Sequence, residues 1–430
     1  MLKRVVSFGL AAAAFTSFSV SSSVRAESTD ARVTPEVSSL MTELTVRVSR
    51  DHISPTKASR LYAYVASAMF LASTSPDDLL RKQMNAAPSV PQADSSINPV
   101  IAALAAGSSV ARNLFPVAAA KTTFGERRDQ VLQSASRDLP AKEVAASIAY
   151  GIAVSDAVVG RAKTDGFEEA KTMMPPETKG PGIWTTTPPG FQPAIDPGWG
   201  TLKTFFTRSG DCTLPAPPTS GDALSPFQGA ADEVATVAKN LTEEQKDIAR
   251  FWDDSRGRTG TPAGHWLVIA LAATEDLQST ALETIRIVAH TMMSIADAFI
   301  VGWKYKYQYM VERPVTVLQR SDTMWSSYLT TPAFPEYPSG HSTISRAAAD
   351  TLTSYLGVWK FTDPGYGMTE ESLGSFDVAP RTFASFDAAA KEASISRLYG
   401  GIHFTIGLES GVTLGACIAK KTLDVEGDET

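Results

Sequence analysis

Cysteine is scarce in this sequence, since its 430 residues include only two, Cys212 and Cys417. A zinc site needs more ligands at closer spacing, so none is expected. The two cysteines either pair as a disulfide or remain two buried free thiols, because the sequence does not show whether their Cα atoms lie within bridging distance. Positive charge is not in excess either, and the net charge of -7 gives no reason to expect nucleic acid or an anionic membrane as a partner. Any anion-binding site must therefore be local.

Long apolar runs and strand patterns are absent beyond the N-terminal region. The apolar segment 266–273 is followed by polar residues 274–276 and is shorter than the ~20 residues that cross a bilayer. No segment alternates like a strand, whereas apolar residues recur at intervals of three or four, as at Leu61, Val65 and Met69. The 43% hydrophobic and 20% charged residues are typical of globular proteins. We therefore predict a soluble, all-α fold built from helical bundles.

The N-terminus has the three parts of a secretory signal. Lys3 and Arg4 precede the apolar run 5–18, and small residues follow up to Ala26, where signal peptidase would cleave. The apolar run is too short for a spanning anchor. We predict a signal peptide over residues 1–26, an exported protein that is periplasmic or secreted, and no membrane span after signal cleavage.

Proline divides the rest of the chain into three parts. Residues 27–172 show helical periodicity and are predicted to form an N-terminal helical scaffold. Residues 173–227 are rich in proline, which disfavours helices and central strands, so we interpret them as an ordered connector packed on the surface. Residues 228–430 are helical again, and Thr242 and Gln245 have the spacing of a capping box at a helix start. The aromatic residues expected to hold the connector against the protein are Trp184, Phe191, Trp199, Phe205 and Phe206.

Two cations are spaced for one helix face. A long helix is predicted from about 276 to 312, because Pro314 cannot continue a helix for long. Lys306 and Arg313 lie seven residues apart, which brings both side chains to nearly the same side of a helix. Alone, the pair is typical of a solvated basic stripe.

A second element is a predicted helix start at Pro338, Ser339, Gly340 and His341, followed by the small-residue run 342–349. Serine is a preferred N-cap, and the free backbone N–H groups at a helix start, with the positive end of the helix dipole, favour a tetrahedral oxyanion. Gly340 lets the backbone approach an anion closely. We expect His341 to face that anion, although a helix cap with an incidental histidine has the same pattern.

A third element contains Arg397 and His403, separated by Gly400 and Gly401. Six positions on one helix would place the two side chains on different faces, but two glycines can end the helix and redirect the chain. Both side chains can then converge on one site.

Together these elements resemble the signature of the type 2 phosphatidic acid phosphatase and vanadium haloperoxidase superfamily. The order and spacing that carry the resemblance are Lys306, Arg313-Pro314, Pro338-Ser339-Gly340-His341, Ser396-Arg397 and His403. The phrases Pro335-Glu336-Tyr337-Pro338 and Tyr399-Gly400-Gly401-Ile402-His403-Phe404 are most similar to the soluble haloperoxidase branch, which implies helical bundles. The resemblance covers the C-terminal half, while segment 196–200 is reminiscent of the same branch.

The resemblance implies a role for each residue. The cage for vanadate, or for phosphate at the same site, would be formed by Lys306, Arg313, Ser339, Gly340, Arg397 and His403. His403 would be the axial ligand of vanadium, and His341 would be the acid–base group. Together with these histidines, the cations Lys306, Arg313 and Arg397 would be catalytic. The implied activity is oxidation of a halide by hydrogen peroxide to hypohalous acid, which reacts with a small organic acceptor.

The same residues allow other functions. In the related acid phosphatases the histidine at position 403 would attack phosphorus, while the one at 341 would protonate the leaving oxygen. Trp303 and Phe334 favour the peroxidase, because they match positions that resemble the chloride pocket of chloroperoxidases, although two core aromatics are an equal interpretation. A third alternative is an exported oxyanion-binding protein without turnover.

One position departs from the family pattern. The family often has aspartate four residues after the last histidine, where this sequence has Gly407. A carboxylate there would orient His403 and raise its basicity, so its absence weakens the ligand unless Glu409 or a carboxylate from elsewhere replaces it. The remaining histidines match no motif and are interpreted as structural: His52, His265 and His290.

Overall fold

The computed structural model describes residues 24–218, 227–365 and 378–424. Within these ranges the helices are α1 (Val24–Arg50), α2 (Pro55–Ser73), α3 (Leu79–Gln83), α4 (Pro99–Leu114), α5 (Ala118–Ala135), α6 (Ala141–Ala162), α7 (Phe167–Ala170), the 3-10 helix η1 (Pro197–Thr201), α8 (Phe227–Lys239), α9 (Glu243–Phe251), α10 (Thr261–Asp276), α11 (Ala281–Tyr309), α12 (Pro314–Leu318), α13 (Gly340–Leu356), α14 (Phe386–Tyr399) and α15 (Thr405–Leu423). Two three-residue strands, β1 (Phe361–Asp363) and β2 (Arg381–Phe383), complete the described elements. The predicted all-α fold is confirmed.

The central element of the fold is α11. It begins at a capping box, in which the Thr280 side chain accepts a hydrogen bond from the backbone N–H of Glu283 and the Glu283 side chain accepts one from Thr280. Most of its residues are buried, so the helix is surrounded by other elements along most of its length. A capping box is also present at the start of α9, where Thr242 and Gln245 predicted one.

The C-terminal end of α11 differs from the prediction. The helix ends at Tyr309 because Met310 adopts a left-handed backbone with φ 50°. Arg313 has extended backbone, which the following Pro314 favours. The predicted helix over 276–312 is therefore wrong at both ends, because α10 covers its first residue and a break precedes α11.

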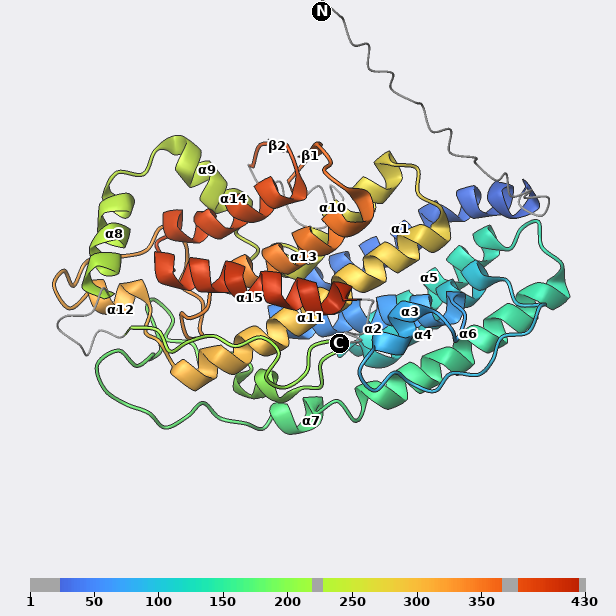
Figure 1. The fold of residues 1–430 in the computed structure, drawn as a ribbon, viewed down its shortest axis with the longest axis horizontal. Coiled ribbons are helices and arrows are strands. Elements are labelled where there is room, and N and C mark those ends of the chain that lie inside the picture. The colour runs from blue at the N-terminus through green and yellow to red at the C-terminus, as the bar shows by residue number, and fades with distance from the viewer. Residues whose placement is uncertain (1–23, 219–226, 366–377, 425–430) are drawn as a thin grey trace, which may run out of the picture.

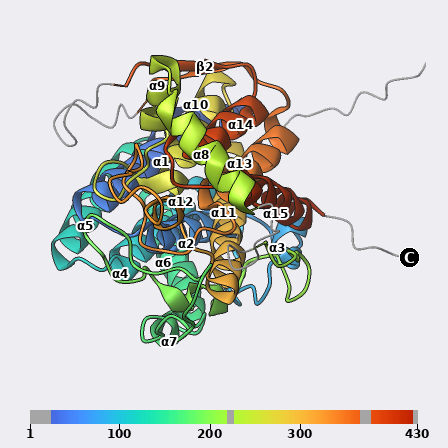
Figure 2. The ribbon, with the colours of Figure 1, turned by 90° about the vertical axis from the view of Figure 1, so that its left-hand side faces the viewer.

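Two groups of helices pack on α11. On one side α2 contacts α11, α4 packs on α2, and α5 and α6 pack on α4. On the other side α13 contacts α11, with α14 and α15 packed on α13. Figure 1 shows α11 running between the blue-to-cyan and the orange-to-red helices, and the turned view in Figure 2 agrees. The core is continuous across both groups, from Val37 to Ile418.

The strands form one antiparallel pair, with Phe361 opposite Phe383. Both of these side chains are buried, and they pack against each other at a centroid distance of 5.5 Å. The last residue of β1, Asp363, is also buried, with 4% of its surface exposed. The hairpin therefore carries a carboxylate into the protein.

The proline-rich connector has no helix or strand other than η1 over its described residues 173–218. Its backbone follows the end of α11, where the Trp184 N–H donates to the Met310 carbonyl oxygen and the Glu312 N–H donates to that of Gly182. The connector is thus an ordered segment that lies against the C-terminal end of α11.

The aromatic residues of the connector pack as predicted with one exception. The buried ones are Trp184, Trp199, Phe205 and Phe206. Phe191 is 61% exposed, so the prediction is wrong for this residue. It follows a turn at residues 188–190 and has a positive φ of 47°, and the chain there is a surface turn.

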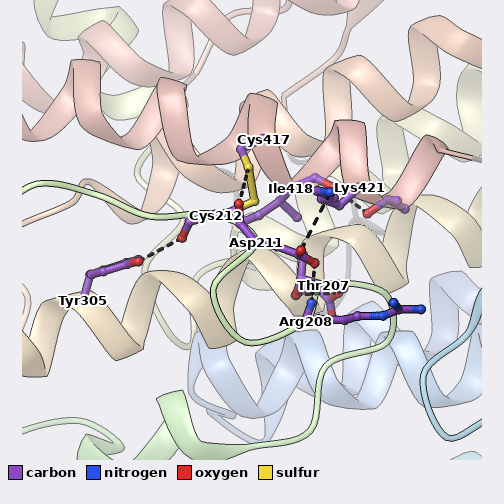
Figure 3. The surroundings of a disulfide bond; sticks show 10 residues. Thr207, Arg208, Asp211, Cys212, Tyr305, Cys417, Ile418 and Lys421 are labelled. Carbon is purple, nitrogen blue, oxygen red and sulfur yellow. Dashed lines mark hydrogen bonds and ion pairs between the residues drawn. A yellow bond between two sulfur atoms is a disulfide. The ribbon is translucent and has the colours of Figure 1, made fainter. Parts of the chain in front are cut away.

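A disulfide joins the connector to α15. Cys212 and Cys417 are bonded with their Cα atoms 5.8 Å apart, although 205 residues separate them in sequence (Figure 3). Beside the bridge the Tyr305 hydroxyl donates to the Cys212 carbonyl oxygen at 2.9 Å. The alternative of two free thiols is thereby excluded, and the connector is covalently attached to α15 and hydrogen-bonded to α11.

The predictions on export and membrane spans stay predictions. Most of the predicted signal peptide, residues 1–23, lies outside the described residues. Two described helices, α6 and α11, are long and apolar enough to cross a membrane by length and composition. The apolar window of α11 is 89% buried inside the protein, as in the core helix of a globular protein, and that of α6 is 28% buried.

Candidate functional site

A cavity of about 700 Å³ lies where the connector meets α13 and the end of α14. Part of its wall comes from predicted site residues, namely Trp303, Phe334, Gly340, His341 and Arg397. Another part comes from most of the connector residues 187–196 and from residues 253–256. Segments far apart in the sequence therefore share one cavity.

The first turn of α13 contributes backbone N–H groups. Ser339 is the N-cap, and its Oγ accepts a hydrogen bond from the Ser342 N–H at 3.3 Å, so the predicted helix start is confirmed. Gly340 is the first helical residue, and a Cβ placed there would lie 3.7 Å from the Trp303 ring. The first N–H groups of a helix lack intrahelical acceptors and lie at the positive end of the dipole. This end of α13 is suited to an anion.

Arg313 is fully buried beside His403. Its Nε donates to the Phe334 carbonyl oxygen at 2.9 Å, and its Nη1 donates to that of Ile402 at 2.7 Å. The same Nη1 lies 3.1 Å from Nε2 of His403. Nη2 is buried and has no hydrogen-bond partner among the described residues. Burial lowers the pKa of Arg313 to about 10, which leaves it charged at neutral pH.

Lys306 is also fully buried, but its donors are engaged. Nζ donates to the carbonyl oxygens of Pro335, Glu336 and Pro338 at 3.0, 3.0 and 2.5 Å. An ammonium group has three donors, so Lys306 holds this loop and supplies charge to the site. Burial and the neighbouring Arg313 lower the pKa of Lys306, and Glu336 opposes them.

Arg397 reaches the cavity from the last turn of α14. Its Nε donates to the Ser396 hydroxyl at 2.9 Å, and its Nη2 donates to the Trp252 carbonyl oxygen at 2.7 Å. The helix ends two residues later, and Gly401 adopts a φ of 70°, which only glycine adopts at little cost. This turn brings His403 toward Arg397, whose charge helps to lower the pKa of His403. The predicted break at the paired glycines is confirmed.

His403 lies in the link between α14 and α15 and is 2% exposed. Its Nδ1 is 2.7 Å from Oε1 of Glu336, which also accepts a hydrogen bond from the Phe404 N–H at 3.2 Å. A carboxylate at Nδ1 favours the tautomer that has its proton on Nδ1 and a lone pair on Nε2. Burial, Arg313 and Lys306 lower the pKa of His403 well below its usual range, so the imidazole is neutral.

His341 faces a different carboxylate. Its Nε2 lies 3.5 Å from Oδ2 of Asp254, within the reach of an ion pair. Behind Asp254, Nδ1 of His265 is 3.2 Å from Asp254 Oδ1, and Nε2 of His265 is 2.8 Å from Asp363. Burial disfavours a charged His265, but the two aspartates outweigh it and raise its pKa to about 10. Burial and Arg397 lower the pKa of His341 to about 4, although Asp254 opposes this shift.

Trp303 and Phe334 form an aromatic pair beside the cations. Their ring centroids are 4.9 Å apart. Lys306 Nζ lies 5.6 Å from the centroid of Trp303 and 5.0 Å from that of Phe334. Cζ of Arg313 lies 4.9 Å from the centroid of Phe334. The predicted pocket residues are therefore adjacent, in an apolar environment next to positive charge.

The structure brings all the predicted site residues into one region and adds three that the sequence analysis missed. These are Glu336, Asp254 and His265, each buried and in contact with another member of the site. Glu336 lies within the phrase that carries the resemblance, so a signal for it existed. Asp254 and His265 had no spacing signal, because a tertiary contact brings Asp254 to His341 and His265 lies behind Asp254.

The other expectations at single positions have mixed outcomes. Glu409 is exposed, and the carboxylate that contacts His403 is Glu336. His265, interpreted as structural, lies directly behind the carboxylate that faces His341. The last two predicted structural histidines are buried His290, which contacts Tyr355 and Thr422, and exposed His52.

The chain matches known proteins in sequence and in fold. Residues 286–428 match the family of the VCPO second helical-bundle domain, a range that contains every predicted site residue. The crystal structure of a bacterial vanadium-dependent iodoperoxidase is 29% identical, with a TM-score of 0.81, over 92% of this chain and 98% of that chain. No curated protein matches the chain in sequence.

Two bacterial vanadium-dependent chloroperoxidase structures share the fold. The holo form is 16% identical, with a TM-score of 0.65, over 88% of this chain and 93% of that chain. The apo form is 17% identical, with a TM-score of 0.62, over 87% of this chain and 95% of that chain.

These similarities define the class of the protein as an all-α helical bundle of the haloperoxidase type. Residues 286–428 match the VCPO second helical-bundle domain family, and the predicted resemblance to the vanadium haloperoxidases is confirmed. The division of the chain into three parts and the roles of single residues stay predictions.

Proposed function

We propose that this protein is a vanadium-dependent haloperoxidase, which oxidises a halide with hydrogen peroxide to hypohalous acid. One observation carries the proposal: the buried, neutral His403 has its Nε2 lone pair directed at a cluster of buried cations, with Arg313 3.1 Å away. The matched family and the similar vanadium-dependent iodoperoxidase support it.

The charges of the site fit an oxyanion such as vanadate or phosphate. Lys306, Arg313 and Arg397 are all buried, and a buried charge is costly unless it is paired. Nη2 of Arg313 and the first N–H groups of α13 are donors available to a bound anion. Glu336 and Asp254 balance only part of this positive charge, and Asp254 is itself shared with His265.

Each site residue has a proposed role. Arg313, Arg397, Ser339 and Gly340 would hold the oxygens of vanadate, Lys306 would add positive charge from the neighbouring loop, and His403 Nε2 would bind the vanadium. When bound, vanadate would supply Lewis-acid chemistry that polarises hydrogen peroxide toward attack by a halide. His341 would accept and return the proton at Nε2, because it is neutral above a pKa of about 4.

The surroundings suggest where the other reactants bind. We assign the halide to the Trp303–Phe334 pair, because an apolar wall beside buried cations favours a weakly hydrated anion. The rest of the cavity, about 700 Å³ in all, has room for a small organic acceptor. Export of the protein remains part of the proposal, on the N-terminal sequence alone.

The deciding experiment compares two activities of the purified protein. Peroxide-dependent halogenation and hydrolysis of a chromogenic phosphate ester are measured with and without added vanadate. Halogenation that requires vanadate supports the proposal. Phosphatase activity that vanadate abolishes would identify an acid phosphatase with His403 as nucleophile. Tight vanadate binding with neither activity would identify an oxyanion-binding protein.

A further inference from the structure

Glu336 is placed to control the orientation of His403. Glu336 is 1% exposed, and its Oε1 accepts hydrogen bonds from His403 Nδ1 at 2.7 Å and from the Phe404 N–H at 3.2 Å. These two contacts involve adjacent residues of the link before α15. One carboxylate oxygen therefore holds both the His403 ring and the backbone of Phe404. The Nδ1 proton is thereby fixed, and Nε2 keeps its lone pair on the side of Arg313.

The loop that carries Glu336 is also the loop that leads into the anion-binding helix start. Its carbonyl oxygens at Pro335, Glu336 and Pro338 are the three acceptors of Lys306 Nζ. Ser339, the N-cap of α13, follows within three residues and donates its N–H to the Gly407 carbonyl oxygen at 2.9 Å. A movement of Glu336 would therefore be transmitted to the helix start as well as to the imidazole.

Gly407 provides the space that Glu336 occupies. A Cβ built on Gly407 would lie 2.1 Å from Glu336 Oε1 and 2.8 Å from its Cδ, distances that real side chains do not reach. Any side chain at 407 must displace the carboxyl group of Glu336. Conversely, an aspartate at 407, four residues after His403, would bring its carboxylate into the volume that the Glu336 carboxyl group fills now.

We propose that Glu336 is the positioning residue of His403 and that Gly407 is required because positions 336 and 407 compete for one carboxylate site. A carboxylate at either position would orient the imidazole for an oxyanion, whereas carboxylates at both would not fit. This inference rests on the proposed function and deepens it, because it identifies the group that aligns the proposed vanadium ligand.

The test uses the full chain and five variants: Glu336→Gln, Glu336→Ala, Gly407→Asp, the double variant Glu336→Ala/Gly407→Asp, and Glu409→Gln as a control for an exposed carboxylate on α15. Vanadate affinity is measured by calorimetry. Nitrogen-15 NMR of histidine-labelled protein without vanadate reports which ring nitrogen of His403 carries the proton. Far-UV circular dichroism shows which variants are folded.

Loss of a partner behind a metal-binding histidine lowers affinity about 10- to 100-fold, and Glu336→Ala is expected to fall in this range with a mixture of His403 tautomers. Glu336→Gln, which keeps an acceptor for Nδ1–H, is expected to retain the tautomer with a smaller loss of affinity. Gly407→Asp alone is expected to weaken binding, whereas the double variant is expected to regain most of the affinity and the single tautomer. Glu409→Gln is expected to behave as the wild type.

Wild-type affinity in Glu336→Ala, or a folded double variant that is no better than Glu336→Ala, would overturn the proposal. If Glu336→Ala does not fold, Glu336→Gln decides by its vanadate affinity, because wild-type affinity in that variant contradicts a role for the carboxylate charge. The NMR measurement needs no vanadate. A wild type that neither halogenates nor binds vanadate would refute the proposed function while leaving the role of Glu336 to be judged from the tautomer.

Discussion

The two histidines of the site are each paired with a buried carboxylate, but the two pairs have different surroundings. Glu336, which contacts His403, lies near the cations Lys306 and Arg313, and burial raises its pKa to about 7 against their influence. Asp254, which faces His341, is in contact with a second imidazole, and the charge of His265 outweighs burial to hold the pKa of Asp254 well below its usual range. The pKa of Glu336 is therefore close to neutral pH, whereas Asp254 is ionised at neutral pH.

This difference matches the two roles proposed for these histidines. A ligand histidine has to keep one tautomer, and a short contact with Glu336 is enough for that. An acid–base histidine has to gain and lose a proton repeatedly, which calls for a neighbouring charge that does not titrate in the same range. The His265–Asp363 pair behind Asp254 keeps Asp254 ionised across this pH range. Substitutions at the two pairs should therefore have distinguishable effects.

The largest effect is expected from His265→Gln. The change removes the cation between two buried aspartates, and breaking a buried ion pair costs about 3–5 kcal/mol of unfolding free energy. Because folding raises the pKa of His265 from its ordinary 6.5 to about 10, the stabilisation is complete below pH 6.5 and is lost as the pH rises to 10. Urea unfolding at pH 6 and pH 10 measures both. A variant as stable as the wild type at pH 6 would show that the pair is not needed.

The next effect separates the two histidines directly. His403→Ala is expected to raise the dissociation constant for vanadate at least about 100-fold, or about 2.7 kcal/mol, because the proposed vanadium ligand is lost. His341→Ala should bind vanadate within a few-fold of the wild type and lose turnover instead. Calorimetry with vanadate and steady-state halogenation distinguish them. Equal vanadate affinity in the wild type and His403→Ala would remove that histidine from the proposed coordination sphere.

A smaller shift is expected in the pH dependence. If neutral His341 accepts the proton, kcat/KM falls as the pH drops through its pKa, which is about 4 before any anion binds and rises when one does. Asp254 raises this pKa, so Asp254→Asn should move the acid limb to lower pH, by about one unit. The measurement is the kcat/KM profile between pH 3 and pH 7, with folding checked at each point. A limb that stays in place or moves upward contradicts the assignment.

The smallest effect is expected at the aromatic pair. Phe334→Leu keeps an apolar side chain but removes the ring that lies over Lys306 and Arg313, so it should raise the KM for halide about 3- to 10-fold at nearly constant kcat. Phe191→Leu, at an exposed turn of the connector, is the matched control. If Phe334→Leu leaves the KM for every halide unchanged, Trp303 and Phe334 are core aromatics and not a halide pocket.

Local patterns predicted what local physics controls. The N-cap at Ser339, the capping box at Thr242 and the break at Gly401 were all predictable, because each depends on backbone donors or dihedral angles within a few residues. The backbone conformation between Lys306 and Arg313 could not be predicted in the same way. A face of one helix was expected, but Met310 ends α11, so the side chains approach each other across a turn.

Residue types and their order along the chain were sufficient to indicate an all-α protein and to predict an oxyanion site, because helical periodicity, caps and clustered cations are properties of short segments. Which carboxylate contacts which histidine depends on the tertiary fold. Glu336 and Asp254 are separated from their partners by 67 and 87 positions, and burial together with neighbouring charge, not spacing, makes them the groups that hold those rings. The same holds for Gly407, whose missing side chain has meaning only because Glu336 fills the space beside it.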